Sequence, residues 1–211
     1  MSDFSTTGTP PRLILASSSI YRRELLCRLH LPFSVDTPDL DEQAAAGEAP
    51  QDTALRLACE KAALVAGRHP PALVIGSDQV ATLDGRHIGK PGTHARALAQ
   101  LQMMRGREVV FHTALCLHDA RSPGPAVVRR ENVQTKVLFR HLPDAALDAY
   151  LRIEQPYDCA GSARNEGLGI ALIAHCQSSD PTALTGLPLI ALCGMLLEAG
   201  VGFFTSQEVT P

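Results

Sequence analysis

Short apolar runs alternate with segments of helical periodicity in the first half of the chain. Residues 13–16 (LILA) and 72–78 (ALVIGSD) are apolar runs of strand length, and residues 32–38 (PFSVDTP) suggest another strand. Residues 51–68 place apolar side chains at helical spacing, and a second helical pattern follows the serines at 17–19. The chain therefore opens as strand, turn and helix, an order typical of α/β proteins.

The second half of the chain predicts a hairpin between helices. Residues 94–105 have a helical pattern, after which residues 107–118 and the alternating stretch at 133–139 predict two strands joined by the turn sequence RSPGP. The remaining segments are expected, in order, as a helix at 142–156, a loop at 161–167, a strand at 168–174 and a helix at 187–200 that Gly200 ends. Alternating elements with a hairpin among them favour an α/β fold with a mixed sheet.

Composition and charge narrow the classes of protein that this chain can be. With 45% hydrophobic and 19% charged residues, the 211 residues are typical of one globular unit. No apolar stretch reaches the roughly 18 residues needed to span a bilayer, and residues 1–11 predict a polar tail rather than a secretion signal, so we expect a cytoplasmic protein. A net charge of −3 argues against a general nucleic-acid binder. An anionic ligand must therefore meet a local positive cluster.

Cysteine and histidine spacing gives no sign of a zinc site. The six cysteines include no close pair along the chain, and the eight histidines include no pair at the spacing of metal ligands on a helix. We expect all six to be reduced residues of the core: Cys27, Cys59, Cys116, Cys159, Cys176 and Cys193.

The sequence LILASSSIYRREL combines a strand end, three serines and two arginines. A strand-to-helix turn presents free backbone N–H groups at the positive end of the helix dipole, where phosphate binds favourably. The hydroxyls of Ser17, Ser18 and Ser19 add donors, and Arg22 and Arg23 can form forked hydrogen bonds to phosphate oxygens. The alternative is an ordinary serine cap followed by surface arginines, and this stretch alone leaves both interpretations open.

Acidic residues occur at three places where they could serve chemistry. Asp78 closes an apolar strand, and ligands of open α/β sheets gather at strand ends. Asp39, Asp41 and Glu42 form an acidic run that is either part of a site or a solvated loop. Asp84, which precedes a glycine, is interpreted as a turn residue.

Two lysines complete the set of candidates for binding phosphate. Lys61 interrupts the apolar rows of the helix at 51–68, and Lys90 lies in the sequence HIGKP, where a glycine and a proline would restrain a loop. Each lysine taken singly is compatible with a surface position. Together with the serines, arginines and carboxylates they match a metal-dependent triphosphate site assembled from distant segments. Neither the P-loop nor the Rossmann glycine pattern is present.

Six motifs in this order resemble the Maf family of nucleoside triphosphate pyrophosphatases, over about residues 12–199. They are LILASSSIYRRELL, PDLDE, CEKA, GSDQVATLDGRHIGKP, DCAGSARNEGLGIALI and DPTALTGLPLIAL. The resemblance implies a two-lobed Maf/ITPase-like α/β fold over residues 12–200, in which helices flank an elongated mixed sheet and a cleft lies between the lobes. Residues 201–211 are expected as a C-terminal tail. The resemblance also implies a homodimer that uses a divalent metal cation, Mg²⁺ or Mn²⁺. From the net charge and the absence of a long apolar stretch, we expect no nucleic-acid and no membrane partner.

The resemblance further assigns roles to individual residues. Asp78 matches the general base, and Glu42 with Asp78 matches the metal position. The substrate-binding positions are Ser17, Ser18, Tyr21, Arg22, Lys61, Gln79, Lys90 and Glu166. The implied reaction is hydrolysis between the α and β phosphates of a nucleoside triphosphate, which gives the monophosphate and pyrophosphate.

The motifs GSDQ, SARNEG and RHL are most similar to the subgroup that acts on 7-methyl-GTP. One residue departs from it, because Tyr21 stands where this subgroup commonly has tryptophan. A tyrosine ring can stack on the cationic methylated guanine less strongly than tryptophan, and the Glu166 carboxylate can accept hydrogen bonds from the guanine N–H groups. Two alternatives are a dTTP/UTP pyrophosphatase of the same family and a nucleotide-binding regulator of cell division without turnover.

Overall fold

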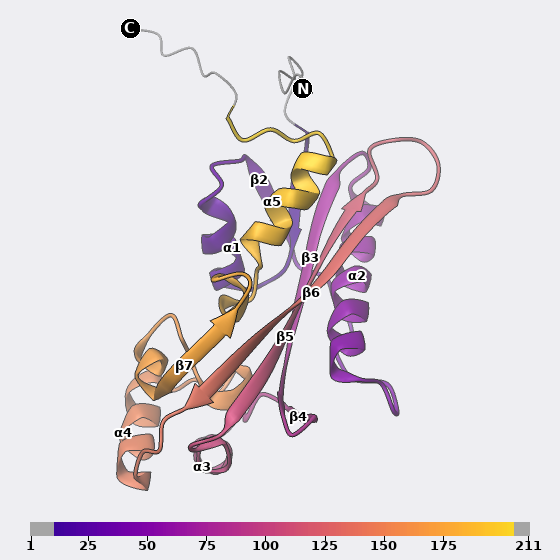
Figure 1. Cartoon of the computed structure of the whole chain (residues 1–211). Coiled ribbons are helices and arrows are strands. Elements are labelled where there is room, and N and C mark those ends of the chain that lie inside the picture. The colour runs from indigo at the N-terminus through magenta and orange to yellow at the C-terminus, as the bar shows by residue number, and fades with distance from the viewer. Residues whose placement is uncertain (1–10, 205–211) are drawn as a thin grey trace, which may run out of the picture.

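A mixed seven-stranded sheet runs the length of the protein in a computed structural model that describes residues 11–204 (Figure 1). The strands are β1 Leu13–Ala16, β2 Phe33–Asp36, β3 Leu73–Leu83, β4 Arg86–Ile88, β5 Glu108–Asp119, β6 Val127–Phe139 and β7 Ile173–Ser178. Their order is β2-β1-β3-β5-β6-β7, and β4 pairs with β3. The pairs β1–β2 and β1–β3 are parallel, and the other four strand pairs of the described residues are antiparallel. The predicted α/β fold with an elongated mixed sheet is confirmed.

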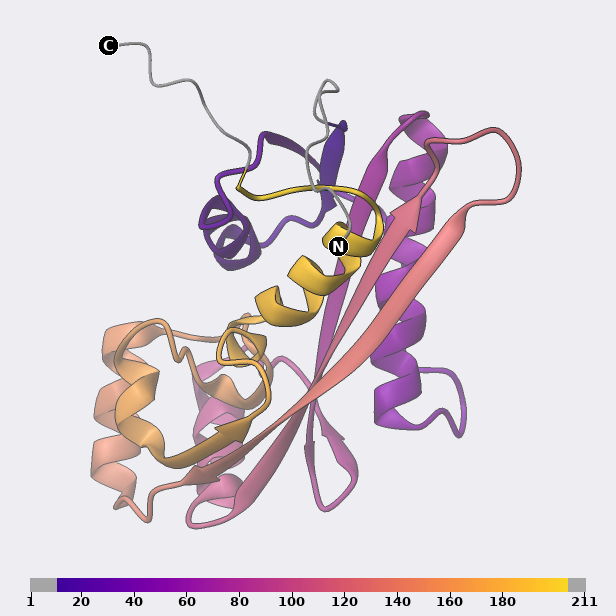
Figure 2. The ribbon, with the colours of Figure 1, turned by 45° about the horizontal axis from the view of Figure 1, so that its top comes forward.

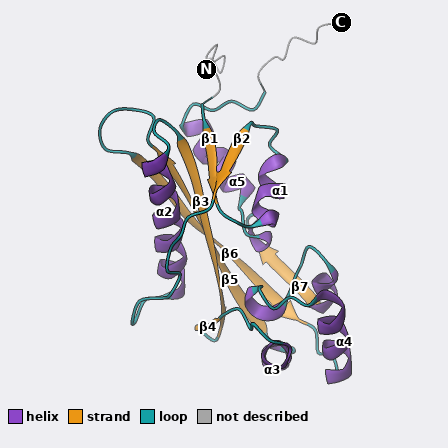
Figure 3. Cartoon of the chain, turned by 180° about the vertical axis from the view of Figure 1, so that it is seen from behind, coloured by secondary structure: helices purple, strands orange, loops and turns teal. Residues whose placement is uncertain are grey.

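In the part of the chain that the structure describes, five α-helices and three short 3₁₀ helices surround the sheet. They are α1 Ile20–Cys27, α2 Pro50–Arg68, α3 His94–Met104, α4 Asp144–Glu154, α5 Leu189–Glu198, η1 Ala160–Ser162, η2 Leu168–Leu172 and η3 Ala183–Thr185. Helix α2 lies on one side of the long strands and helices α1 and α5 lie on the other, as the view from behind also shows (Figure 3). Helices α3 and α4 lie at the end of the sheet that is opposite to β1 and β2 (Figure 2). Within the described residues, no helix has the length and apolar composition to cross a membrane.

Three apolar clusters hold these layers together. One packs α1 and α5 against β1, β3 and β5, and a second packs α2 against the opposite face of the same strands. The third joins α3, α4 and β4 to the far ends of β3, β5 and β6. The long strands thus connect two packed ends.

The edge of β3 is open between these two ends. On one side of β3, strand β1 pairs with Leu73–Gly76 and strand β4 pairs with Ala81–Leu83. Residues 77–80 have no strand partner on that side among the described residues. Successive side chains of a strand point to opposite faces of the sheet, so Asp78 and Gln79 enter this gap on different faces.

Helix α2 packs unusually closely on β3, and Gly76 makes this possible. A Cβ atom at Gly76 would lie only 2.1 Å from the backbone oxygen of Ala58 and 2.9 Å from the Ala62 Cβ. The glycine therefore sets the distance between helix and strand. Lys61, on the same buried face of α2, is brought against β3 by this contact.

The sequence pattern predicts a strand at 168–174, but the observed strand begins only at Ile173. Residues Leu168–Leu172 form η2, and the strand is Ile173–Ser178. The Leu168 backbone N–H donates to the Glu154 carboxylate, and Gly169 packs so closely on Arg164 that an added Cβ would lie 2.3 Å from its backbone oxygen. These tertiary contacts override the apolar run, whose length alone does not separate strand from helix.

Smaller differences from the expectations occur elsewhere. The sequence HIGKP contributes to strand β4, which the sequence pattern missed. Of the six cysteines expected in the core, Cys116 is buried, Cys59, Cys159 and Cys193 are half-buried, and Cys27 and Cys176 are exposed, so the expectation was wrong for the exposed pair and holds fully only for Cys116. Residues 1–10 and 205–211 of the two expected tails lie outside the described residues, and Val201, assigned to the C-terminal tail, is buried in the core.

Candidate active site

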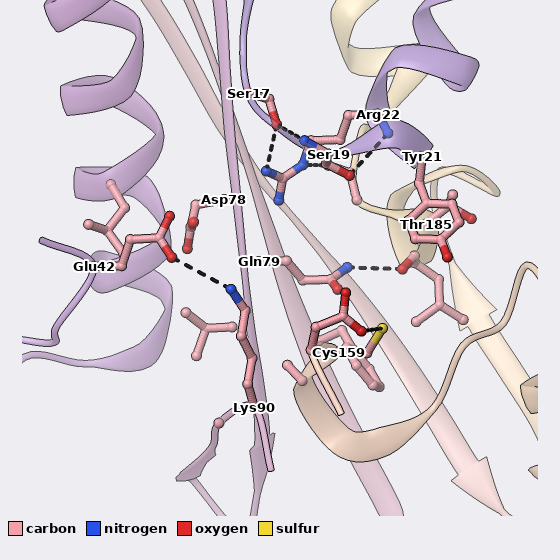
Figure 4. A pocket seen from close by; sticks show the side chains of 18 of the residues that line it. Ser17, Ser19, Tyr21, Arg22, Glu42, Asp78, Gln79, Lys90, Cys159 and Thr185 are labelled. Carbon is pink, nitrogen blue, oxygen red and sulfur yellow. Dashed lines mark hydrogen bonds and ion pairs between the residues drawn. The ribbon is translucent and has the colours of Figure 1, made fainter. Parts of the chain in front are cut away.

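The gap along β3 opens into a pocket of about 630 Å³. The ten residues to which the family resemblance assigns roles all line it, although they come from six separate segments of the chain: Ser17, Ser18, Tyr21, Arg22, Glu42, Lys61, Asp78, Gln79, Lys90 and Glu166. Figure 4 shows two differently composed ends. We call Ser17, Arg22, Glu42, Lys61, Asp78 and Lys90 the charged end. We call Tyr21, Asp158, Cys159 and Glu166 the aromatic end, with Gln79 between the two.

The turn between β1 and α1 combines a helix cap with a binding surface. The Ser19 hydroxyl caps α1 by accepting from the Arg22 backbone N–H at 3.4 Å, as expected. The Ser17 hydroxyl is buried and accepts from the Ser19 backbone N–H at 3.1 Å and from Arg22 Nη1 at 3.3 Å. The capping and binding interpretations of these serines are therefore compatible. Arg23 is exposed and does not line the pocket, so the expected arginine pair is reduced to Arg22.

The Arg22 guanidinium is anchored from the far side of the pocket. Its Nε donates to the backbone oxygen of Gly186 at 2.9 Å, and the same oxygen accepts from the Ser77 hydroxyl at 2.8 Å. Gly186 has φ +107°, and a side chain there would also press on Arg22. This glycine was not singled out from the sequence, because its role depends on a contact 164 residues away.

Lys61 joins two carboxylates at the centre of the charged end. Its Nζ lies 2.5 Å from Glu42 Oε1 and donates to Asp78 Oδ1 at 2.6 Å. Lys61 and Asp78 are both buried, so this pair is shielded from water. Lys90 is more exposed, and its Nζ lies 3.9 Å from Glu42 Oε2. Four charged groups thus converge from a loop, a helix and two sides of the β3–β4 hairpin.

The cations of the charged end keep Glu42 ionised. Burial on its own raises the pKa of Glu42, but the hydrogen bond and charge of Lys61, together with Lys90 and Arg22, outweigh it and leave the pKa below the ordinary value. The other acidic candidates lie elsewhere. Asp39 and Asp41 do not line the pocket, and Asp84 occupies the β3–β4 turn, as expected, where it pairs with Arg107.

The carboxylates fit a divalent cation that arrives with a phosphate ligand. Within the described residues, no group of three His, Cys, Asp or Glu side chains is placed to hold a metal ion by itself. Glu42 and Asp78 nevertheless converge on one point, where each contacts the Lys61 ammonium. Mg²⁺ typically takes one or two carboxylates and completes its coordination with water and phosphate oxygens, a rule that these two oxygen donors satisfy.

The aromatic end combines a tyrosine ring with carboxylates. Burial raises the pKa of Glu166, while nearby Arg164 lowers it and Glu24 adds to the rise. The walls of the pocket therefore disfavour the charged form of Glu166, and a cationic ligand would favour it. Burial also raises the pKa of Tyr21, which Arg164 lowers, so the tyrosine ring remains a neutral stacking surface.

Gln79 is held by its amide nitrogen. Nε2 lies within hydrogen-bond distance of the Thr113 hydroxyl at 2.9 Å and of the backbone oxygens of Ala183 and Leu184 at 3.1 and 3.0 Å. Two of these acceptors belong to η3 and the third, Thr113, to the neighbouring strand β5, and their common position determines the orientation of the amide. The amide nitrogen is thus engaged, and the side-chain oxygen is the group that Gln79 can offer to a ligand.

Further lining residues were missed by sequence reasoning. Thr185 lines the pocket, and its hydroxyl accepts from Asn165 Nδ2 at 3.0 Å, which connects the loop after η1 to η3. Asp158 and Cys159 line it from the loop before η1. The only signal for these residues in the sequence was their position inside the quoted motifs, because small polar residues in loops carry no periodic pattern.

A family model described as Maf-like protein matches residues 12–199, which is most of the chain. The chain belongs to the Maf family. Its relatives include a protein named 7-methyl-GTP pyrophosphatase from Cupriavidus metallidurans, which is 63% identical over 199 residues that cover 94% of this chain and 98% of that protein. A protein of the same name from Paraburkholderia xenovorans is 63% identical over 210 residues, with 98% and 100% covered. Among solved structures, the Staphylococcus aureus Ham1 protein is 14% identical with a TM-score of 0.44, and the match covers 89% of this chain and 98% of that chain.

The Maf motifs quoted from the sequence all reach this pocket. The serine turn, the acidic loop, the CEKA helix and the GSDQ strand build the charged end, and SARNEG contributes Glu166 to the aromatic end. The motif DPTALTG supplies Gly186, which anchors Arg22. Segments of this Maf protein that are far apart in sequence are thus adjacent in one site.

Proposed function

We propose that this protein hydrolyses the bond between the α and β phosphates of 7-methyl-GTP and releases 7-methyl-GMP and pyrophosphate. The observation that carries the proposal is one pocket with a cationic, carboxylate-bearing end and an aromatic, carboxylate-bearing end. The names of relatives at 63% identity support the same substrate.

The charged end would bind the triphosphate. The anchored guanidinium of Arg22 presents forked N–H donors, and Lys61 and Lys90 add ammonium charges that offset charge on the pyrophosphate leaving group. The serine hydroxyls and the free N–H groups at the start of α1 supply neutral donors to phosphate oxygens. The cluster is local, so a protein of net charge −3 can still bind a polyanion.

Asp78 would orient and deprotonate the attacking water. Lys61 holds its Oδ1, which restricts the carboxylate to one orientation and leaves Oδ2 for the water. Glu42 and Asp78 would hold the divalent cation, whose chemistry there is to acidify a water and to offset phosphate charge. The burial of Asp78 and Lys61 limits competing bulk water around the reacting phosphate.

The aromatic end would select the base. Methylation at N7 makes guanine a delocalised cation, which stacks on the Tyr21 ring and is attracted by Glu166. The Glu166 carboxylate and the Gln79 side-chain oxygen are acceptors, and the Watson–Crick edge of guanine offers adjacent N–H donors. A pyrimidine lacks that pair of donors and would leave an acceptor unpaired.

The direct test is pyrophosphate release in Mg²⁺ from 7-methyl-GTP, GTP, dTTP, UTP and CTP at one concentration. We expect the highest rate with 7-methyl-GTP. A preference for dTTP or UTP would contradict the assignment of the base and leave the phosphate chemistry in place. Tight nucleotide binding without pyrophosphate release would favour the regulatory alternative.

The proposal extends to the cellular location, the oligomeric state and the metal ion of the enzyme. We propose that it acts in the cytoplasm, as a homodimer, with Mg²⁺ or Mn²⁺ and without nucleic-acid or membrane partners. Light scattering of the purified chain measures the mass of the assembly, and a monomer at all concentrations would contradict the dimer.

A further inference from the structure

Two cysteines that are far apart in the sequence meet between α2 and the sheet. Cys59 lies on α2 at the edge of its buried face, and Cys116 is fully buried on β5. Cys116 belongs to the apolar cluster beneath α2, and Cys59 packs against the same cluster. All six cysteines are free thiols in the structure.

The close packing at Gly76 explains why a helix thiol reaches a strand thiol. Gly76 and Cys116 are direct partners in the β3–β5 ladder. The backbone of Ala58, which precedes Cys59, approaches Gly76 so closely that no side chain fits between them. Helix α2 is therefore lowered onto the sheet at the position where Cys116 projects, which brings together two thiols that ordinary helix–sheet packing would separate.

Arg130 adds a cation to this pair. It is the direct partner of Cys116 in the β5–β6 ladder, so its side chain leaves the same face of the sheet, toward α2. The neighbouring Cys116 thiol lowers the pKa of Cys59, burial raises it, and the charge of Arg130 lowers it further. The neighbouring Cys59 thiol and burial raise the pKa of Cys116. Cys59 is half-buried and Cys116 is fully buried, so Cys59 is the thiol that an oxidant reaches first.

We propose that Cys59 and Cys116 are an oxidation site, at which hydrogen peroxide converts the two thiols into a reversible disulfide between α2 and β5. The Cys59 thiolate attacks one peroxide oxygen, the O–O bond breaks, and Cys59 becomes a sulfenic acid as hydroxide leaves. The Cys116 sulfur then attacks the Cys59 sulfur, and the S–O bond breaks. The Cys116 proton and the departing oxygen leave as water. Each sulfur has lost one electron, and the peroxide has been reduced to two waters.

The location gives the disulfide a connection to the pocket. Lys61 follows Cys59 by two residues on α2, and Asp78 follows Gly76 by two residues on β3. The disulfide and the Lys61–Asp78 ion pair thus cross the same gap between helix and sheet. Its formation depends only on the two thiols and Arg130, and is independent of the proposed hydrolysis.

The test is peroxide treatment of the full chain, followed by denaturation, alkylation of free thiols and peptide mapping without reductant. We expect a linked peptide that contains Cys59 and Cys116, which dithiothreitol separates. Cys159, Cys176 and Cys193, whose pKa values burial raises, are internal controls and should stay alkylated. A map in which Cys59 and Cys116 remain free while other thiols oxidise would overturn the proposal.

Two variants separate the roles of the three residues. Cys116→Ser keeps a hydroxyl donor beside Cys59 but removes the second sulfur, so it should leave Cys59 as a sulfenic acid that a dimedone probe traps, whereas Cys193→Ala should form the disulfide as the wild type does. Arg130→Gln keeps both thiols and changes an exposed residue, and it should slow formation of the disulfide several-fold. An unchanged rate in Arg130→Gln, with the same disulfide formed, would show that the arginine has no part in the site.

Discussion

At the charged end of the pocket, the functional side chains are held by one another, whereas at the aromatic end they extend separately from the start of a helix and from loops. Lys61 contacts Glu42 and Asp78, and Arg22 is anchored by Gly186. At the aromatic end, Tyr21 lies in the first turn of α1, and Glu166 lies in the loop between η1 and η2. A preorganised charged end suits a triphosphate that is common to many substrates, and an adaptable aromatic end suits discrimination among bases.

The largest expected effect is at Asp78. Asp78→Asn keeps the size of the side chain and removes the base, so kcat should fall by about 10²–10⁴-fold with every nucleotide. Pyrophosphate release measures the loss, and thermal unfolding checks the fold. Asp84→Asn, in the exposed β3–β4 turn, is the matched control and should keep wild-type turnover. Near-wild-type turnover in folded Asp78→Asn would contradict the assignment.

Substitution of Arg22 tests whether the charged end contributes equally to binding of nucleotides with different bases. Arg22→Lys keeps the charge but cannot bond Gly186 and Ser17 at once, so we expect kcat/KM to fall by about 10- to 100-fold, the range for lost charged hydrogen bonds. The factor should be equal for 7-methyl-GTP and GTP. Arg23→Lys, on the exposed side of α1, is the control. Unequal factors for the two nucleotides would mean that the two ends are not separate.

In contrast to Arg22, substitution of Glu166 should affect 7-methyl-GTP and GTP unequally. Glu166→Gln should lower the preference for 7-methyl-GTP over GTP by about tenfold, because an acceptor that lines the pocket loses the charge that attracts a cationic ring. The comparison of kcat/KM for the two nucleotides measures this change. An unchanged ratio would remove Glu166 from the set of residues that read the base.

The same carboxyl group predicts a difference in pH dependence between the ends. The pKa of Glu166 is raised by burial, so as the pH falls its charge is lost at a higher pH than for an ordinary glutamate. The pKa of Glu42 is lowered, so the charged end keeps that carboxylate to a lower pH. The kcat/KM for 7-methyl-GTP should therefore decline on the acid side through the raised pKa of Glu166, and this limb should disappear in Glu166→Gln.

The smallest expected effect is at Tyr21. Tyr21→Trp enlarges the face on which the methylated base stacks, and we expect KM for 7-methyl-GTP to fall by about two- to threefold. GTP carries no such positive charge on its ring, so its KM should change less. A Tyr21→Trp variant that improved both nucleotides equally would indicate added contact area rather than cation–π stacking.

More residues of the charged end than of the aromatic end could be predicted from sequence patterns. Asp78, Arg22 and Lys61 stand out because charged residues interrupt apolar patterns at the ends or faces of buried elements. Thr185, Asp158 and Cys159 lie in loops without periodicity, and nothing local marks them as pocket residues. The prediction that a strand begins at residue 168 was wrong for a related reason, because contacts with Glu154 and Arg164 decide the conformation of residues 168–172.

The sequence by itself determined the mixed α/β class, most helix and strand positions and the chemical types gathered at the site, because periodicity and capping are local properties. Only the tertiary structure decided which groups meet. The bridge of Lys61 between Glu42 and Asp78, the anchoring of Arg22 by Gly186 and the packing of Cys59 against the cluster that contains Cys116 all depend on the pairing of distant segments. Such contacts depend on strand register and on the close approach at Gly76, which no local pattern encodes.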